Sequence, residues 1–395
     1  MHVHTRRPLG WGRRPRHEVA EIFRTHGADY RRAHGLTPEQ LKVMHAIEAC
    51  RTEKLGGHLY VCDQCHHELG AYNSCRNRHC PTCQSLNQAR WIEQRKERVL
   101  DVQHFHVVFT LPSQLRPVVF LNRKKLFDLL FASAAQTLLE LGQDPDRLGV
   151  QLGVTVVLHT WSRKLHFHPH VHCVVTAGGL ATKGSERFIH SPHDFLFPLP
   201  VMRQLFRGKF LDGLRKLYDA GELELVGSCR DLEDTEAFRI LTDSLYRKDW
   251  VAYCEPPFGG AVGVFEYLGR YTHRIGISNH RIIDVGDNHV TFRTKGDQQE
   301  TASPQDFIRR FLLHVLPKGY VKIRHFGLMA SANVNTKLVR AHQLLGSKTP
   351  EDAAPKASDW LEHLFILTGF DLLQCPRCRS GRLHARPLPA RLDTS

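Results

Sequence analysis

The sequence lacks long apolar runs. None of its 395 residues belongs to a stretch of about 18 consecutive apolar residues, the length of a helix that crosses a bilayer. Its basic beginning, MHVHTRRPLGWGRRPRHE, is not followed by the apolar segment of a secretory signal. Internal repeats and low-complexity tracts are also missing. The chain is therefore expected to be soluble and cytoplasmic, and its 42% hydrophobic content can form a core in more than one domain.

Acidic residues are fewer than basic residues. The chain has 40 Asp and Glu against 54 Lys and Arg, which gives a formal net charge of +14. A charge of this size favours an anionic partner, and nucleic acid is the commonest one for a soluble basic protein.

The cysteines do not suit a secreted disulfide framework, because their total of 11 is odd and six of them are clustered near the N-terminus. Clustered thiols in a reducing compartment usually bind metal. The spacing C-x2-C-x14-C-x2-C is close to that of structural zinc sites, and four thiolates leave no open position for chemistry. This pattern predicts a structural zinc bound by Cys62, Cys65, Cys80 and Cys83.

Four more residues in this region form a second complete set of zinc ligand types: Cys50, His58, Cys75 and His79. Their spacings are less diagnostic, so packed or helix-capping residues remain an equal alternative to a second zinc. Further along, Cys375 and Cys378 form one C-x2-C pair without an obvious mate, and no metal is assigned to it.

The order of apolar patterns predicts a helical and zinc-binding start followed by a sheet domain. Residues 1–35 are expected to be a basic, weakly ordered arm. A helix should then begin at Thr37, with Pro38 at its first position and Gln40 as the partner in a capping box. The remaining expected elements are a linking helix over 87–100, a strand over 104–112, a helix ended by Gly142, a strand pair over 153–179, a basic helix over 202–221, a strand over 249–257, a helix over 259–278, a hairpin over 281–294 and a helix capped by Ser303.

The stretch HFHPHVHCVV places histidines at every second position. Alternate residues of a strand point to the same face, so His170 and His172 should present their imidazoles side by side as a metal platform. Pro169 fits the start of the strand, which puts His166 and His168 in its lead-in. His159, in the strand paired through the hairpin, is the candidate third ligand, and His168 is its rival. A solvated strand face is the alternative for the whole motif.

Two tyrosines, Tyr267 and Tyr271, are four residues apart in EYLGRYTHR and should stack on one side of the expected helix. Arg270 and Arg274 accompany them, so the segment combines two phenol nucleophiles with guanidinium groups that can bind phosphate. Two ordinary packed tyrosines are the alternative.

Together and in this order, several motifs resemble one known family: SCRNRHCPTCQ, HTW, HPHVHCVVTAGGL, YLGRYTHRIGISN and HVLPKGYVKIRHFG. The sequence is similar to the HUH (His, hydrophobic, His) two-tyrosine transposases of the insertion sequence 91 family, which are relatives of rolling-circle replication initiators. The resemblance extends from about residue 30 to residue 335. It implies that His170 and His172 bind a divalent cation, Mg²⁺ or Mn²⁺, and that Tyr267 and Tyr271 attack DNA.

The resemblance also implies the fold, the domains and the partners. An α/β fold is expected, with a central antiparallel sheet flanked by helices after a small zinc-binding module. The expected divisions are an arm over 1–35, a zinc-binding domain over 36–98, a catalytic domain over 99–335 and a C-terminal tail over 336–395. The substrates would be single-stranded DNA at the ends of a bacterial transposon and target DNA, tracked by basic helices at 203–216 and 309–324, with no membrane partner. A non-catalytic, zinc-stabilised DNA-binding regulator is the competing interpretation, although it would need neither the histidines nor the tyrosines.

Overall fold

The computed structural model describes residues 15–83, 98–192, 194–258, 276–347, 365, 369 and 371–390. The chain divides into two compact units, and neither is continuous in sequence. One unit comprises residues 1–89, 277–315 and 354–395, and the other comprises residues 90–276 and 316–353. Within the described segments, no helix combines the length and the apolar character needed to cross a membrane.

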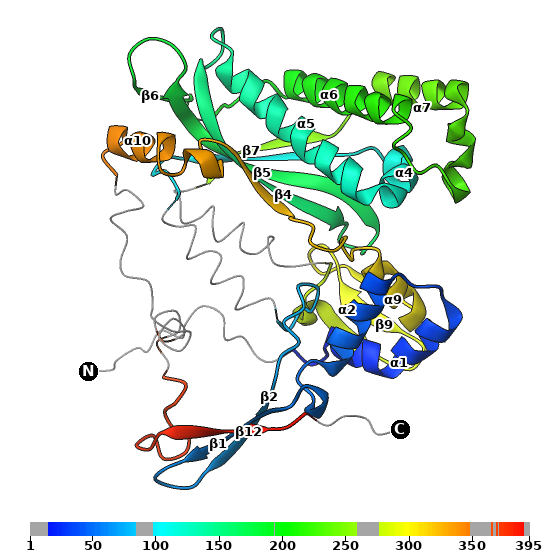
Figure 1. Ribbon diagram of the computed structural model, residues 1–395, viewed down its shortest axis with the longest axis vertical. Helices are drawn as coiled ribbons and strands as arrows, with labels where there is room; N and C mark the ends of the chain where they lie inside the picture. The colour runs from blue at the N-terminus through cyan, green and yellow to red at the C-terminus, as the bar shows by residue number, and fades with distance from the viewer. Residues whose placement is uncertain are drawn as a thin grey trace. The chain divides into compact units, whose positions relative to one another are not determined.

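The second unit contains an antiparallel sheet, as the sequence predicts. Among the described residues, six strands form it in the order β11-β4-β5-β3-β7, with β6 added beside β5 (Figure 1). The strands are β3 (His104–Thr110), β4 (Val150–Trp161), β5 (Phe167–Ala181), β6 (Phe188–His190), β7 (Ala252–Phe258) and β11 (Ile323–Gly327). The expected strand pair is confirmed, because β4 and β5 are long antiparallel neighbours.

Helices cover one face of this sheet (Figure 1). Phe109 on β3 packs against Phe206 with 4.6 Å between ring centroids, and Phe206 packs on Trp250. All three side chains are fully or almost fully buried, so they anchor the helices to the sheet. The helices in the described residues of this unit are α4 (Arg116–Leu121), α5 (Arg123–Gln143), α6 (Leu199–Asp219), α7 (Thr235–Arg247) and α10 (Lys337–Leu344), with short 3-10 turns at Ser113–Leu115, Gly227–Glu233 and Ser331–Asn333.

Strand β5 carries two irregularities that bracket a regular stretch of pairing with β4. The register shifts between Leu152 and Val154, and again between His159 and Trp161. The second shift leaves an extra residue of β5 near Pro169, which has no N–H to donate to the ladder. Because β5 already begins at Phe167, His168 lies inside the strand, and its placement in a lead-in was wrong.

The first unit combines a helical cluster with two small sheets. Its helices are α1 (Val19–Ala33), α2 (Pro38–Ala49) and α9 (Pro304–Leu312), and a short 3-10 turn spans Asn279–Arg281. Phe23 of α1 packs edge-on against Phe311 of α9 at 5.2 Å between ring centroids. Ordered helix over Val19–Ala33 corrects the expectation of a weakly ordered arm there, because one face of α1 is buried.

Both predicted helix starts in this unit are confirmed. The Thr37 side chain accepts a hydrogen bond from the N–H of Gln40, and the Gln40 side chain accepts one from the N–H of Thr37. Ser303 caps α9 in the same way through the N–H of Asp306. The predicted hairpin is present as β8 (Ile282–Val285) and β9 (Val290–Arg293), and β10 (Gln299–Ala302) extends it.

A second three-stranded sheet joins distant parts of the chain. Strand β1 (Gly57–Cys62) lies between β2 (Glu68–Tyr72) and β12 (Leu383–Leu388), and a 3-10 turn at Glu53–Leu55 precedes it. Figure 1 shows the C-terminal β12 beside β1. The C-terminal segment is therefore part of the N-terminal fold.

Four predicted helices differ from the structure or fall largely outside its described residues. Helix α5 continues through Gly142 to Gln143, so this glycine does not end it. The basic segment 309–324 is not one helix, because α9 ends at Leu312 and β11 begins at Ile323. The helices expected over 87–100 and 259–278 fall mainly or wholly on residues outside the described ranges.

Candidate metal centres

The strand register puts three histidines on the sheet face opposite α5 and α6. Val171 lies directly opposite Phe109, whose ring packs on α6, so Val171 shares the helix-covered face. Alternation then places His170 and His172 on the other face. His159 lies directly across from His170 on β4 and shares that face.

The three imidazoles form one cluster. Each of His159, His170 and His172 offers a ring nitrogen, and these atoms all lie within 4.8 Å of one another. His159 is buried, its ring stacks on Trp161 at 4.6 Å between centroids, and the other two rings are partly buried. A cation can therefore be reached by all three nitrogens from one side of the sheet.

Burial keeps the rings of His170 and His172 neutral at ordinary pH. It lowers the pKa of His170 to about 4 and holds the pKa of His172 well below its usual range. A neutral imidazole keeps one unprotonated nitrogen, which is the form that binds a metal.

The proton on His170 is placed by the backbone. Its Nδ1 lies 2.7 Å from the carbonyl oxygen of His168, and a carbonyl can only accept, so Nδ1 is the donor. The Nε2 atom of His170 is then the nitrogen with a lone pair for a metal.

A chain of hydrogen bonds places the proton on His172 in the same way. The Nδ1 of His106 on β3 is 3.0 Å from a carboxylate oxygen of Glu255 on β7, and the Nε2 of His106 is 2.8 Å from Nδ1 of His172. Burial lowers the pKa of His106, so its ring is neutral and donates once, to the carboxylate. Its Nε2 must then accept from Nδ1 of His172, which leaves Nε2 of His172 unprotonated.

His168, the rival third ligand, is engaged elsewhere. Its Nδ1 lies 3.0 Å from a guanidinium nitrogen of Arg116, and a guanidinium can only donate. The cluster contains His159 and not His168, which favours the first of the two sequence candidates. The other proposed catalytic and DNA-binding residues, Tyr267, Tyr271, Arg270 and Arg274, lie outside the described residues.

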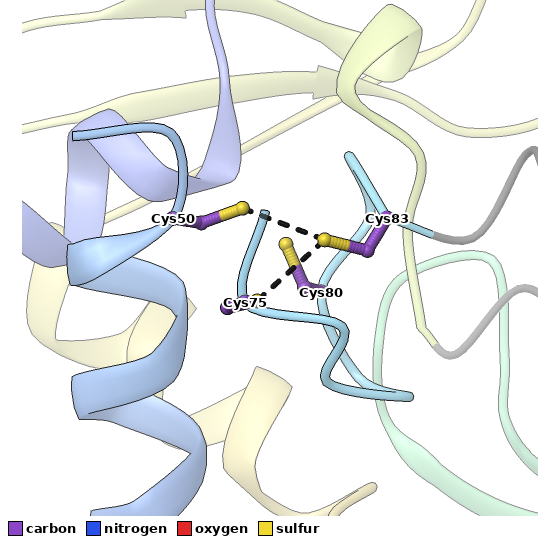
Figure 2. Close-up of side chains that lie close together, drawn as sticks. All are labelled: Cys50, Cys75, Cys80 and Cys83. Carbon is purple, nitrogen blue, oxygen red and sulfur yellow. Dashed lines mark hydrogen bonds between the residues drawn. The ribbon is translucent and has the colours of Figure 1, made fainter. Parts of the chain in front are cut away.

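Four cysteines of the first unit meet in a second cluster (Figure 2): Cys50, Cys75, Cys80 and Cys83. The Cys83 sulfur lies 3.5 Å from that of Cys50 and 3.6 Å from that of Cys75. A tetrahedral zinc with bonds of about 2.3 Å separates its sulfur ligands by about 3.8 Å, so the spacing fits zinc. Hydrogen bonds from the thiols of Cys50, Cys75 and Cys80 hold the pKa of Cys83 well below its usual range.

The surrounding backbone supports this cluster. The N–H of Cys80 donates to the carbonyl of Asn77, and the N–H of Cys83 donates to that of Cys80, which closes a tight turn. The Asn279 side chain donates to Thr82 and accepts from the N–H of Val19 at the start of α1. Asn279 thus links the ligand turn to the start of α1.

The remaining C-x2-C pairs meet in a third cluster made of Cys62, Cys65, Cys375 and Cys378. The expected ligand set of Cys62 and Cys65 with Cys80 and Cys83 was therefore wrong, as was the set that included His58 and His79. Cys62 and Cys65 lie at the tip of the β1-β2 hairpin, whereas Cys50 and Cys75 lie at its open end. A six-residue strand separates the two ends by about 20 Å, too far for one ion.

Sequence reasoning missed four of the residues that the fold brings to these clusters. His106 and Glu255 precede and follow the His motif by many residues, and only the sheet register joins them to it. Cys375 and Cys378 have the spacing of zinc ligands but no second cysteine pair near them in sequence. That unpaired spacing was the signal that could have identified them as ligands completed by distant residues.

Two family models match the chain. One, described as "Putative transposase", covers residues 153–337, and the other, described as "Transposase zinc-binding domain", covers residues 22–111. A protein of Sinorhizobium fredii (strain NBRC 101917 / NGR234) named "Putative transposase y4qJ" is 45% identical over 376 residues, which cover 93% of this chain and 94% of the relative. This chain belongs to the insertion sequence 91 family of transposases.

A more distant relative of this transposase is the "Transposase for insertion sequence element IS801" of Pseudomonas savastanoi pv. phaseolicola. It is 29% identical over 324 residues, which cover 80% of this chain and 76% of the relative. No solved structure matches the transposase. The zinc-binding family domain and the cysteine clusters together support structural zinc.

The cluster geometry distinguishes the ligand sets experimentally. In the full-length transposase, Cys50→Ala should remove about one zinc per chain and lower the thermal stability, because three thiolates bind zinc much less tightly than four. His58→Ala should retain all the zinc, because His58 lies outside both cysteine clusters. Metal analysis of the purified variants checks this, and zinc loss from His58→Ala as well as from Cys50→Ala would restore the set of Cys50, His58, Cys75 and His79.

Proposed function

We propose that this transposase cleaves and rejoins single-stranded DNA at the ends of its element through a 5′ phosphotyrosine, in rolling-circle transposition. The observation that supports this most directly is the cluster of His159, His170 and His172, with two of its rings held in the metal-binding tautomer. A regulator that only binds DNA needs no such cluster.

The three imidazoles would hold a divalent cation, Mg²⁺ or Mn²⁺. They converge from one sheet face and leave the remaining coordination positions to oxygen atoms, and burial keeps His170 and His172 neutral. When bound, the cation polarises the non-bridging oxygens of the scissile phosphate. The histidine side chains would hold the cation in place, and the pairing of β4 with β5 holds the histidines in place.

Tyr267 and Tyr271 are the proposed nucleophiles. The phenol of one tyrosine loses its proton as its oxygen attacks the phosphorus, the bond from phosphorus to the 3′ oxygen breaks, and the departing oxygen takes up one proton to become a 3′ hydroxyl, so no net proton is gained or lost. The phosphotyrosine stores the energy of the broken bond, so a free 3′ hydroxyl can reverse the step without ATP. Two tyrosines permit two successive transfers without release of the strand.

We propose that the two units have different roles. The cysteine-rich unit would bind zinc and contribute to DNA recognition, and the sheet unit would carry the chemistry. Arg270 and Arg274, beside the tyrosines in sequence, would contact phosphates. The basic side chains that give the chain its net charge of +14 would supply most of the DNA affinity.

Removing a metal ligand should separate cleavage from binding. His170→Ala and His172→Ala should each abolish cation-dependent cleavage of single-stranded oligonucleotides from the element's ends, while DNA affinity changes by less than about threefold, because basic side chains supply most of it. His190→Ala, an exposed histidine on β6, is the matched control and should cleave normally. Covalent adducts on a denaturing gel and binding by fluorescence anisotropy measure the two properties. Normal cleavage by both variants would contradict the assigned metal site.

The tyrosines can be tested without disturbing their packing, since phenylalanine keeps the ring and removes the nucleophilic oxygen. The double variant Tyr267→Phe, Tyr271→Phe should form no protein–DNA adduct, and each single variant should fail to complete transposition. Tyr246→Phe, an exposed tyrosine of α7, should form the normal amount of adduct. An adduct in the double variant, mapped by mass spectrometry to another residue, would refute the assigned nucleophiles.

The hydrogen-bond chain from Glu255 gives a further prediction. Glu255→Gln removes the obligate acceptor for His106, so the tautomer of His172 is no longer imposed and Mn²⁺ affinity should fall about 10- to 100-fold. Saturating Mn²⁺ should restore most of the cleavage rate, since no group that touches DNA is changed. Calorimetric Mn²⁺ titration and the metal dependence of cleavage check this. Glu222→Gln, whose carboxylate pairs with Lys125, is the control, and equal affinity in both variants would remove Glu255 from this role.

A further inference from the structure

The C-terminal segment is held against the N-terminal hairpin by a continuous strand pairing. β12 runs antiparallel to β1 over the whole of that strand, from Gly57 opposite Leu388 to Cys62 opposite Leu383. The zinc-binding family model ends at residue 111, so Cys375 and Cys378, which immediately precede β12 in sequence, lie outside it. The pairing brings them back to Cys62 and Cys65.

The two C-x2-C turns have matching backbone geometry. In the first turn the N–H of Cys62 donates to the carbonyl of His67, and the N–H of His66 donates to that of Cys62. In the second, the N–H of Cys375 donates to the carbonyl of Gly381, and that of Arg379 donates to Cys375. Each turn thus folds around its own cysteine pair.

Amide groups of both turns point at the sulfur atoms. The N–H of Gln64 lies 3.4 Å from the Cys62 sulfur, and the N–H of Gly381 lies 3.3 Å from the Cys378 sulfur. Such donors stabilise thiolates, the form in which cysteine binds metal. His66 and Arg379 also have positive φ values of 54° and 59°, at the position directly after the second cysteine of each turn.

The turns are packed tightly against each other. A Cβ atom at Gly381 would lie 2.5 Å from the Cys62 sulfur, so only glycine fits there. The backbone of Asp63 donates to the carbonyl of Arg382, and the N–H of Arg382 donates to the Asp63 carboxylate at 2.8 Å. These bonds fix the distance between the two cysteine pairs.

The sulfur spacing fits zinc and not a disulfide. The sulfur of Cys62 lies 3.7 Å from that of Cys378, and the same distance separates Cys65 from Cys375. A disulfide needs about 2.05 Å, whereas sulfur ligands of a tetrahedral zinc lie about 3.8 Å apart. All four sulfur atoms lie within 4.8 Å of one another.

We propose that Cys62, Cys65, Cys375 and Cys378 bind a second structural zinc that fastens the C-terminal segment of the transposase to its N-terminal zinc-binding domain. The ion joins residues more than 300 positions apart in the chain, so residues 371–390 belong to the zinc-binding domain and not to a separate tail. The proposal concerns metal content alone and does not depend on how the protein cleaves DNA.

The wild-type, full-length protein allows a test without mutation. Zinc-loaded protein is treated with N-ethylmaleimide before and after zinc removal by a chelator, and each cysteine is quantified by mass spectrometry. Cys375 and Cys378 should be protected together with Cys62 and Cys65, and all four should react at least tenfold faster after chelation. Equal labelling of Cys375 and Cys378 in both states, with Cys50 and Cys83 protected, would overturn the proposal.

A variant pair gives an independent count of the zinc. Wild-type protein should contain two zinc ions per chain, Cys378→Ala should contain one, and Cys229→Ala, a buried cysteine outside both clusters, should contain two. Native mass spectrometry of the full chain gives these numbers directly. Two zinc ions retained in Cys378→Ala, or a single zinc in the wild type that Cys50→Ala removes, would refute the second site.

Discussion

The histidine cluster of the sheet unit depends on one stretch of strand pairing. Between its two irregularities, β5 pairs regularly with β4 from Val175 opposite Val154 to His170 opposite His159. This register places His159, His170 and His172 on one face, and Val171, Cys173 and Val175 on the other face, which the helices cover. A slip of one residue would exchange the two faces, so the apolar core beneath the helices also determines where the histidines point.

The same sheet supplies the groups that orient the histidines. Because β3 lies between β5 and β7, its His106 can accept from His172 and donate to Glu255 at the same time. Burial disfavours the charged imidazolium and so keeps a single proton on each ring. Three strands far apart in sequence therefore act together to present one unprotonated nitrogen.

The cysteine-rich unit is held together by different means. Its described parts come from three separate stretches of the chain, and its two small sheets are only three strands each. Small sheets bury little apolar area, and zinc bound to four thiolates commonly supplies the missing stability in such modules. Among the described residues, five other than glycine have positive φ, and four of them directly follow a clustered cysteine: Arg51, His66, Arg76 and Arg379. Backbone of this kind persists where the surroundings strongly constrain it, as two zinc sites would.

The sequence alone was sufficient for features that depend on neighbours in the chain. The capped helices, the β4-β5 pairing and the shared face of His170 and His172 follow from periodicity and local hydrogen bonding, which act over a few residues, and the α/β class followed from the family resemblance. The tertiary structure decided every pairing across long separations: Cys62 and Cys65 with Cys375 and Cys378, Cys50 and Cys75 with Cys80 and Cys83, and Glu255 with His106. Spacing in sequence could not reveal these partners, because a hairpin of about 20 Å separates cysteines that are close in the chain, while strand pairing joins residues hundreds of positions apart.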